Sequence, residues 1–114
     1  MTTIWHNPRC SKSRQTLALL EDRGISPDIR LYLQDSPSTD EICAVLDQLG
    51  LEDPRALTRT GEAEYREQGL AKVTDRDALI RAMAATPKLI ERPVVIHNGR
   101  AALGRPPEAV LELF

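Results

Sequence analysis

The sequence has few cysteines, few aromatic residues and no long apolar segment, and neither sign of charge dominates it. Two cysteines, Cys10 and Cys43, occur among 114 residues, which is too few for the disulfide scaffold of a small secreted domain. The expected compartment is a reducing cytoplasm, where a functional thiol is generally catalytic. No stretch approaches the ~20 apolar residues of a membrane span, and the first residues lack the pattern of a secretory signal. A net charge of −2 gives no indication of nucleic-acid binding.

The rest of the composition is that of an ordinary globular protein. Apolar residues make up 41% and charged residues 28% of the chain, and no repeat, low-complexity tract or linker interrupts it. We therefore expect a single domain over residues 1–114 with one core. The protein is also expected to act as a monomer, although composition does not determine the oligomeric state. Any anion site has to be a local concentration of arginine and lysine.

Residues 6–14, with the sequence HNPRCSKSR, carry the clearest chemical pattern. They join a short apolar segment to a helical pattern that begins near Ser11, so Cys10 is expected at a helix N-terminus. The first helical amides have no partner within the helix and, with the helix dipole, favour an anion. Such a position lowers a thiol pKa from ~8.5 to roughly 3.5–7.5 when cations are near. A buried structural cysteine is the alternative, but the polar neighbours favour a reactive nucleophile that meets an anionic substrate.

Apolar periodicity and turn residues predict alternating strands and helices. A strand at 2–5 precedes a helix at 11–23 that stops at Gly24, and alternation predicts a strand at 28–33. The Ser-x-x-Glu spacing at residues 38–41 predicts a capped helix that ends at Gly50. Cys43 lies on this helix, where we favour a structural role over that of a resolving thiol for Cys10.

The second half of the chain begins with a weakly patterned segment and ends with a hairpin. Within residues 51–71 we expect a helical turn at 53–57 and a short helix at 62–68 that Gly69 ends, and a carboxylate-capped helix begins at 74–77. Asn98-Gly99 between two apolar runs predicts a hairpin of strands 94–97 and 100–103, and prolines then open a last helix. The fold class is therefore α/β, a mixed sheet flanked by helices.

Four segments together carry a resemblance to a known family. They are HNPRCSKSR at 6–14, ALTR at 56–59, ERPVV at 91–95 and GRP at 104–106. The combination resembles the ArsC family, the glutaredoxin-coupled arsenate reductases of the ArsC/Spx superfamily, and the similarity runs essentially from end to end. It implies a thioredoxin-like fold in which a helical insertion separates a βαβ half from a ββα half.

The resemblance also implies roles for individual residues. Cys10 would attack arsenate, while His6 and Ser13 would assist activation of its thiolate, and the peptide bond before Pro93 would be cis and face the cysteine. Oxyanion binding and thiolate stabilisation would fall to three arginines, Arg59, Arg92 and Arg105. Lys12 and Arg14 are candidates from the sequence itself, because they lie close to Cys10 and would add positive charge for substrate binding. Arginine presents a planar fork of donors that suits an oxyanion, although a solvated surface charge is the default role of this residue. His6 has the alternative role of a capping or packing residue.

The implied reaction is arsenate reduction in arsenic resistance, without a bound metal or organic cofactor. Glutathione would resolve the adduct on Cys10 and glutaredoxin would restore the thiol. An external thiol is needed because Ser13 replaces the second cysteine of a Cys-x-x-Cys pair. Ser11-Lys12 stands where well-known arsenate-reducing members carry Gly-Thr. Two alternatives remain open: an Spx-like redox regulator that binds RNA polymerase, although those usually carry Cys-x-x-Cys, and a glutathione-dependent thiol reductase with another substrate.

Overall fold

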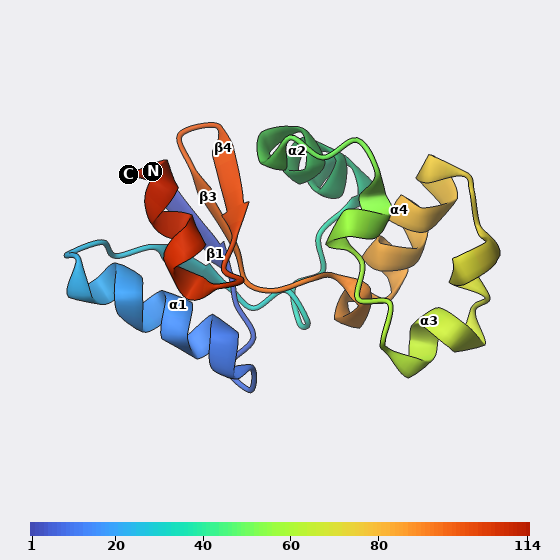
Figure 1. The fold of residues 1–114 in the computed structure, drawn as a ribbon, viewed down its shortest axis with the longest axis horizontal. Helices are drawn as coiled ribbons and strands as arrows, with labels where there is room; N and C mark the ends of the chain where they lie inside the picture. Colours follow the sequence, from blue (N-terminus) through green and yellow to red (C-terminus); the bar gives the residue numbers. More distant parts are fainter. The chain divides into compact units, whose positions relative to one another are not determined.

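The computed structural model describes all of residues 1–114 and contains two compact units, which we describe separately. The first unit comprises Met1–Asp35 and Arg92–Phe114, and the second comprises Ser36–Glu91. Figure 1 shows the course of the chain from the N-terminus in blue to the C-terminus in red. The prediction of a single domain over residues 1–114 stays a prediction.

A four-stranded mixed sheet forms the centre of the first unit. Its strands are β1 (Thr2–Trp5), β2 (Asp28–Arg30), β3 (Val94–His97) and β4 (Arg100–Leu103), in the order β2-β1-β3-β4. The β1–β2 pair is parallel and the other two pairs are antiparallel. Helix α1 (Ser11–Asp22) makes the crossover that two parallel strands require.

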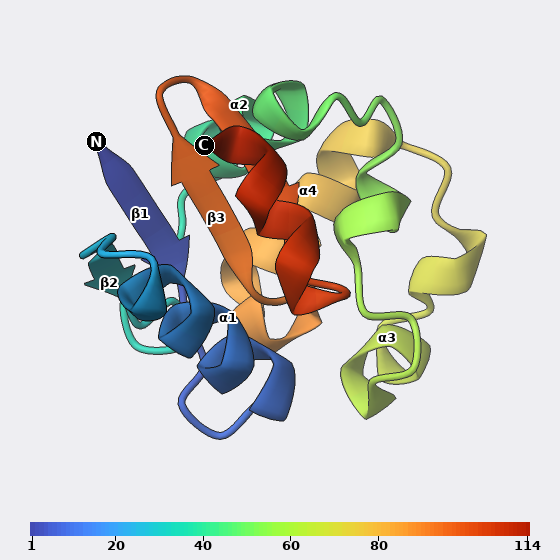
Figure 2. The ribbon, with the colours of Figure 1, turned by 60° about the vertical axis from the view of Figure 1, so that its left-hand side comes forward.

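One face of this sheet is covered by α1 and by the 3₁₀ helix η4 (Pro107–Leu113), as Figure 2 shows. Ile4 of β1 and Val95 of β3 are paired in register and point to the same face. They form a core with three residues of the covering helices, Leu20, Val110 and Leu113. Burial of these side chains fixes α1 on the sheet and, with it, the position of the helix N-terminus.

Of the predictions made from local sequence in the first unit, the hairpin is confirmed and the length of one strand is wrong. Asn98 and Gly99 have φ values of 48° and 79°, the left-handed conformations that a two-residue hairpin turn requires. The predicted strand at 28–33 was too long, because β2 ends at Arg30. Beyond it the amides of Gln34 and Asp35 both donate to the carbonyl of Leu31, at 2.9 and 2.8 Å, so the chain turns although the apolar alternation continues.

The second unit is helical and corresponds to the predicted insertion. It contains α2 (Thr39–Leu49), η1 (Pro54–Leu57), α3 (Ala63–Glu67), η2 (Leu70–Lys72), α4 (Arg76–Ala85) and η3 (Pro87–Leu89). The capping box before α2 is confirmed, since Glu41 N donates to Ser38 Oγ at 3.2 Å and Ser38 N donates to Glu41 Oε1 at 3.0 Å. The short helices η2 and η3 were not predicted. No helix of the structure has the length and apolar character needed to cross a membrane.

Candidate functional site

Cys10 lies at the N-cap position of α1, as the sequence predicted. The preceding loop is a tight turn in which Cys10 N donates to the carbonyl of Asn7 at 3.0 Å. The side chain of Asn7 also accepts a hydrogen bond from Arg9 N at 3.0 Å, which is the Asx turn that asparagine favours. The loop thus delivers the sulfur to the first turn of the helix, with the residue only 9% exposed.

The pKa of the Cys10 thiol is lowered by its surroundings. Burial is the largest single influence and raises the pKa, but four favourable interactions with the thiolate outweigh it. They are the backbone N–H of Ser13, a hydrogen bond from the Arg92 side chain, the charge of Arg92, and the backbone N–H of Lys12. Both backbone donors belong to the first turn of α1, so helix start and guanidinium act together on the sulfur.

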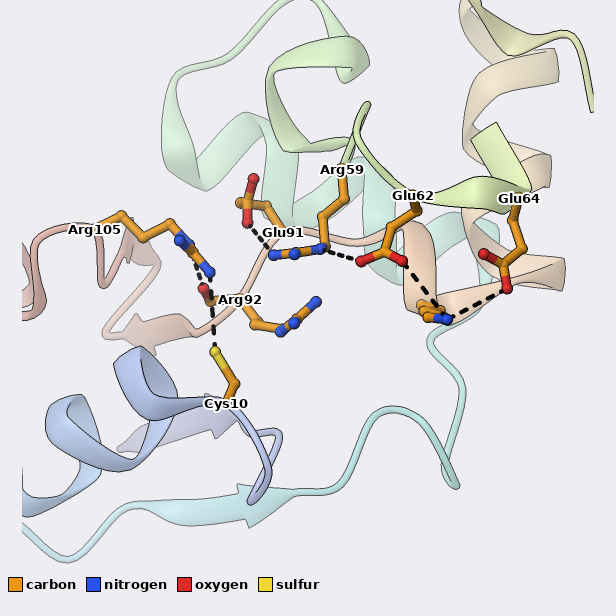
Figure 3. A network of polar contacts seen from close by, with 8 residues as sticks. Cys10, Arg59, Glu62, Glu64, Glu91, Arg92 and Arg105 are labelled. Carbon is orange, nitrogen blue, oxygen red and sulfur yellow. Dashed lines mark hydrogen bonds and ion pairs between the residues drawn. The ribbon is translucent and has the colours of Figure 1, made fainter. Parts of the chain in front are cut away.

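Two arginines from distant parts of the sequence meet at this thiol. Arg105 Nη2 lies 3.9 Å from Cys10 Sγ, and Arg105 Nε donates to the carbonyl of Arg92 at 2.8 Å (Figure 3). Each arginine precedes a cis peptide bond, at Pro93 and at Pro106. The cis bond at Pro93 confirms the expectation from the resemblance, whereas the one at Pro106 was not predicted.

His6 and Ser13 are close to each other and fully or almost fully buried. His6 Nδ1 and Ser13 Oγ are 2.7 Å apart, and Ser13 Oγ also accepts from Asn7 N at 3.0 Å. The hydroxyl therefore ties the loop to α1. Burial and then the charge of Arg14 lower the pKa of His6, which favours the neutral imidazole. The structure gives His6 a hydrogen bond with Ser13, and the predicted part of both residues in activating the thiolate stays a prediction.

Lys12 and Arg14 lie on the first turn of α1 and are exposed. Arg14 Nη1 donates to the carbonyl of Pro8 at 2.9 Å, which fixes its guanidinium beside the loop. Their predicted part in substrate binding stays a prediction.

Arg59 and Cys43 belong to the second unit. Arg59 Nε lies 2.9 Å from Glu62 Oε1, and Arg59 Nη1 lies 3.0 Å from Glu91 Oε1. Cys43 is half-buried on α2, and both cysteines of the chain are free thiols. The chain has no group of three or more histidine, cysteine, aspartate or glutamate side chains that could hold a metal ion.

Sequence reasoning assigned no role to two residues that shape the thiol site, Asn7 and Gly104, although both lie in segments that carry the family resemblance. Asn7 could have been found from its place before a proline, which is a turn signal. A Cβ at Gly104 would lie 2.4 Å from Thr16 Oγ1 and 2.7 Å from Pro93 Cγ, so the backbone there packs against α1 and Pro93 at a distance only glycine allows. No local pattern indicates that approach, because it depends on the assembled sheet.

Comparison with known proteins shows the family of this chain and agrees with its fold. The model of the ArsC family matches residues 5–113. Among relatives, the chain is 47% identical over 112 residues to an arsenate reductase of Haemophilus influenzae, covering 97% of both chains. It is 48% identical over 111 residues to the uncharacterized protein YfgD of Escherichia coli, covering 96% of this chain and 93% of that one.

A solved structure shows the same architecture. The structure titled arsenate reductase from Vibrio cholerae superposes with a TM-score of 0.97 at 53% identity, covering 99% of this chain and 97% of that chain. The mixed sheet, the helices that flank it and the helical insertion are therefore the thioredoxin-like α/β fold that the resemblance implied. The chain belongs to the ArsC family.

Proposed function

We propose that this chain is an arsenate reductase, an oxidoreductase that works with glutathione and glutaredoxin. The observation that carries the proposal is the Cys10 sulfur at the N-cap of α1, with a lowered pKa and with Arg105 Nη2 at 3.9 Å. A cysteine whose pKa is lowered, and which lies beside guanidinium groups, suits attack on a tetrahedral oxyanion. Relatives named arsenate reductase that align over nearly the whole chain support the choice of substrate.

In the proposed first step, the Cys10 thiolate attacks As(V) and a protonated oxygen leaves as water. The sulfur–arsenic bond of this adduct is then broken when a glutathione thiolate attacks the Cys10 sulfur. The electron pair of the broken bond stays on arsenic, which leaves as As(III) arsenite, and Cys10 is left in a disulfide with glutathione. A glutaredoxin thiolate attacks the glutathione sulfur and releases the Cys10 thiolate.

Each predicted site residue has a place in this proposal. Arg92 and Arg105 stabilise the thiolate and, with Arg59, bind the substrate oxygens through fork-like donors. Lys12 and Arg14 add positive charge around the oxyanion, and Ser13 with His6 holds the loop that presents Cys10. Ser13 occupies the position of a second cysteine, so the glutathione disulfide needs an external thiol. The donors are diffusible, no cofactor stays bound, and the protein acts as a cytoplasmic monomer.

The test is a coupled assay with arsenate, glutathione, glutaredoxin and a glutathione-reductase system that consumes NADPH. We expect arsenate-dependent NADPH consumption that Cys10→Ser abolishes, while Cys43→Ser, the matched cysteine control, retains it. Activity that survives Cys10→Ser would contradict the mechanism. Glutathionylation of Cys10 without any arsenate-dependent turnover would instead favour a thiol reductase with another substrate.

A further inference from the structure

Two ion pairs hold the side chain of Arg59, one of the predicted substrate-binding residues. Its guanidinium contacts two carboxylates at once, Glu62 at Nε and Glu91 at Nη1, at 2.9 and 3.0 Å (Figure 3). The exposed fractions of the three side chains are 23%, 17% and 22%. These ion pairs are therefore shielded from water on most sides, unlike the exposed surface pairs that contribute little.

Backbone pairing brings the segment that carries Arg59 next to the segment that carries Glu91. Thr58 and Ile90 form an antiparallel bridge, so the two residues that follow them lie on facing segments. Arg59 N donates to the carbonyl of Leu89 and Glu91 N donates to the carbonyl of Leu57, each at 2.7 Å. Glu62 follows three residues after Arg59 and is itself contacted by Lys88 Nζ at 3.6 Å.

The two carboxylates use separate nitrogens of the guanidinium. A guanidinium has five N–H donors in one plane. Contacts at Nε and Nη1 fix two points of that plane and so determine its rotation, while both N–H groups of Nη2 are left for a ligand. Two negative charges beside an anion-binding arginine would on charge alone weaken its attraction for an oxyanion. Their benefit has to come from geometry.

We infer that Glu62 and Glu91 are positioning residues that hold the Arg59 guanidinium in the plane in which Nη2 receives the substrate oxyanion. The inference rests on the proposed function, in which Arg59 binds that oxyanion. An arginine that is already held loses less side-chain freedom when the ligand arrives, and preorganisation of this kind raises affinity. What matters is the reach of the carboxylate oxygen, and its charge is secondary.

Substitutions at Glu91 separate reach from charge. Glu91→Gln keeps the accepting oxygen at the same distance without the charge, whereas Glu91→Asp keeps the charge on a side chain one methylene shorter. We expect Glu91→Gln to keep the KM for arsenate within about twofold of the parent. Glu91→Asp and Glu91→Ala should raise it about five- to thirtyfold, with kcat changed less. The upper limit corresponds to about 2 kcal/mol, the rotamer entropy of an arginine side chain.

The matched control is Glu64→Gln. Glu64 pairs with Lys88 at 3.6 Å in the same network but does not contact Arg59. The KM of Glu64→Gln for arsenate should therefore equal the parent value. A second readout needs no turnover, because bound sulfate should protect Cys10 from alkylation by iodoacetamide. The sulfate concentration needed for half-maximal protection should be higher in Glu91→Asp than in the parent and unchanged in Glu91→Gln. If circular dichroism shows that a Glu91 variant does not fold, the comparison is made instead between Glu62→Asp and Glu62→Gln.

The outcomes separate the inference from the function on which it rests. If Arg59→Ala leaves both KM and sulfate protection unchanged, Arg59 is not an oxyanion ligand and that part of the proposed function is wrong. If Arg59→Ala raises KM but Glu91→Asp does not, positioning is refuted. Positioning is equally refuted if Glu91→Asp behaves as the parent and Glu91→Gln behaves as Glu91→Ala, because charge would then be the essential property.

Discussion

Gly104→Ala tests whether the thiol site depends on one close backbone contact. The added methyl would lie 2.4 Å from Thr16 Oγ1 and 2.7 Å from Pro93 Cγ, both far inside van der Waals contact. Neither neighbour can move away easily. Thr16 is fully buried and donates to the carbonyl of Lys12 at 2.8 Å, and Pro93 is a rigid, buried ring. The backbone at the end of β4 therefore has to shift.

The expected loss of stability follows from the size of this overlap. Overpacking by one methyl destabilises a well-packed core by about 1–3 kcal/mol. A chain of 114 residues has an unfolding entropy of roughly 0.24 kcal/mol per kelvin, so Tm should fall by about 4–13 °C. Gly61→Ala is the matched control, because a Cβ at Gly61 has no atom within 4 Å and the residue has no positive φ. Its Tm should stay within about 2 °C of the parent.

The same shift should reach the thiol. Gly104 N donates to the carbonyl of Pro93 at 3.0 Å, and the next residue, Arg105, contacts both Cys10 Sγ and the Arg92 carbonyl. Displacement of this segment weakens the interactions that favour the thiolate, so the pKa of Cys10 should rise. The assay is the rate of iodoacetamide alkylation against pH, beside a melting curve. A Gly104→Ala protein with the parent Tm and the parent alkylation profile would refute the reasoning. Thr16→Ala in the same chain should restore part of the stability, since it removes the nearer contact.

Three further predictions concern the loop and the first turn of α1. The pKa of Cys10 is lowered on folding, so the difference in free energy of unfolding between the parent and Cys10→Ser should depend on pH. Measured by denaturant titration, it should shift in favour of the parent as pH rises through the folded pKa of Cys10 and level off above the unfolded pKa. A difference that does not change with pH would contradict the lowered pKa. Ser13→Ala leaves His6 Nδ1 and Asn7 N without their shared partner and should destabilise by about 1–3 kcal/mol in the same titration, whereas a loss below 0.5 kcal/mol would contradict that role. Lys12→Gln should slow attack of glutathione on a Cys10 mixed disulfide about two- to threefold at low salt, and should slow attack of mercaptoethanol less, because its attacking thiolate carries a smaller negative charge than that of glutathione; equal effects on both thiols would exclude electrostatic recruitment by Lys12.

Local signals predicted the parts of the fold that depend on neighbouring residues. The hairpin follows from Asn98-Gly99, α2 from its capping box, and the place of Cys10 from the break between an apolar strand and a helical pattern. The length of β2 was overestimated, because apolar alternation shows which side chains could be buried but not which backbone groups form hydrogen bonds with a neighbouring strand. The turn at Leu31 competes successfully for those amides.

The arginines of the site, unlike Cys10, could be predicted only through the family resemblance. Arg92 and Arg105 follow Cys10 by more than 80 residues, and only the pairing of β1 with β3 and β3 with β4 brings them to the start of α1. The partners of Arg59 were not predicted either. Glu91 reaches it through the bridge between Thr58 and Ile90, a two-residue pairing too short to leave an alternating pattern in the sequence.

The burial of Ser13 has a consequence for the evolution of this active site. Its side chain is wholly enclosed, and both the ring of His6 and an amide of the loop depend on its hydroxyl. A Ser13→Cys mutation would create a Cys-x-x-Cys motif with Cys10. The new sulfur would lie inside the protein, in place of a hydroxyl that has two hydrogen-bond partners. A cysteine at position 13 would therefore cost the two hydrogen bonds that the Ser13 hydroxyl makes to His6 and to Asn7 N.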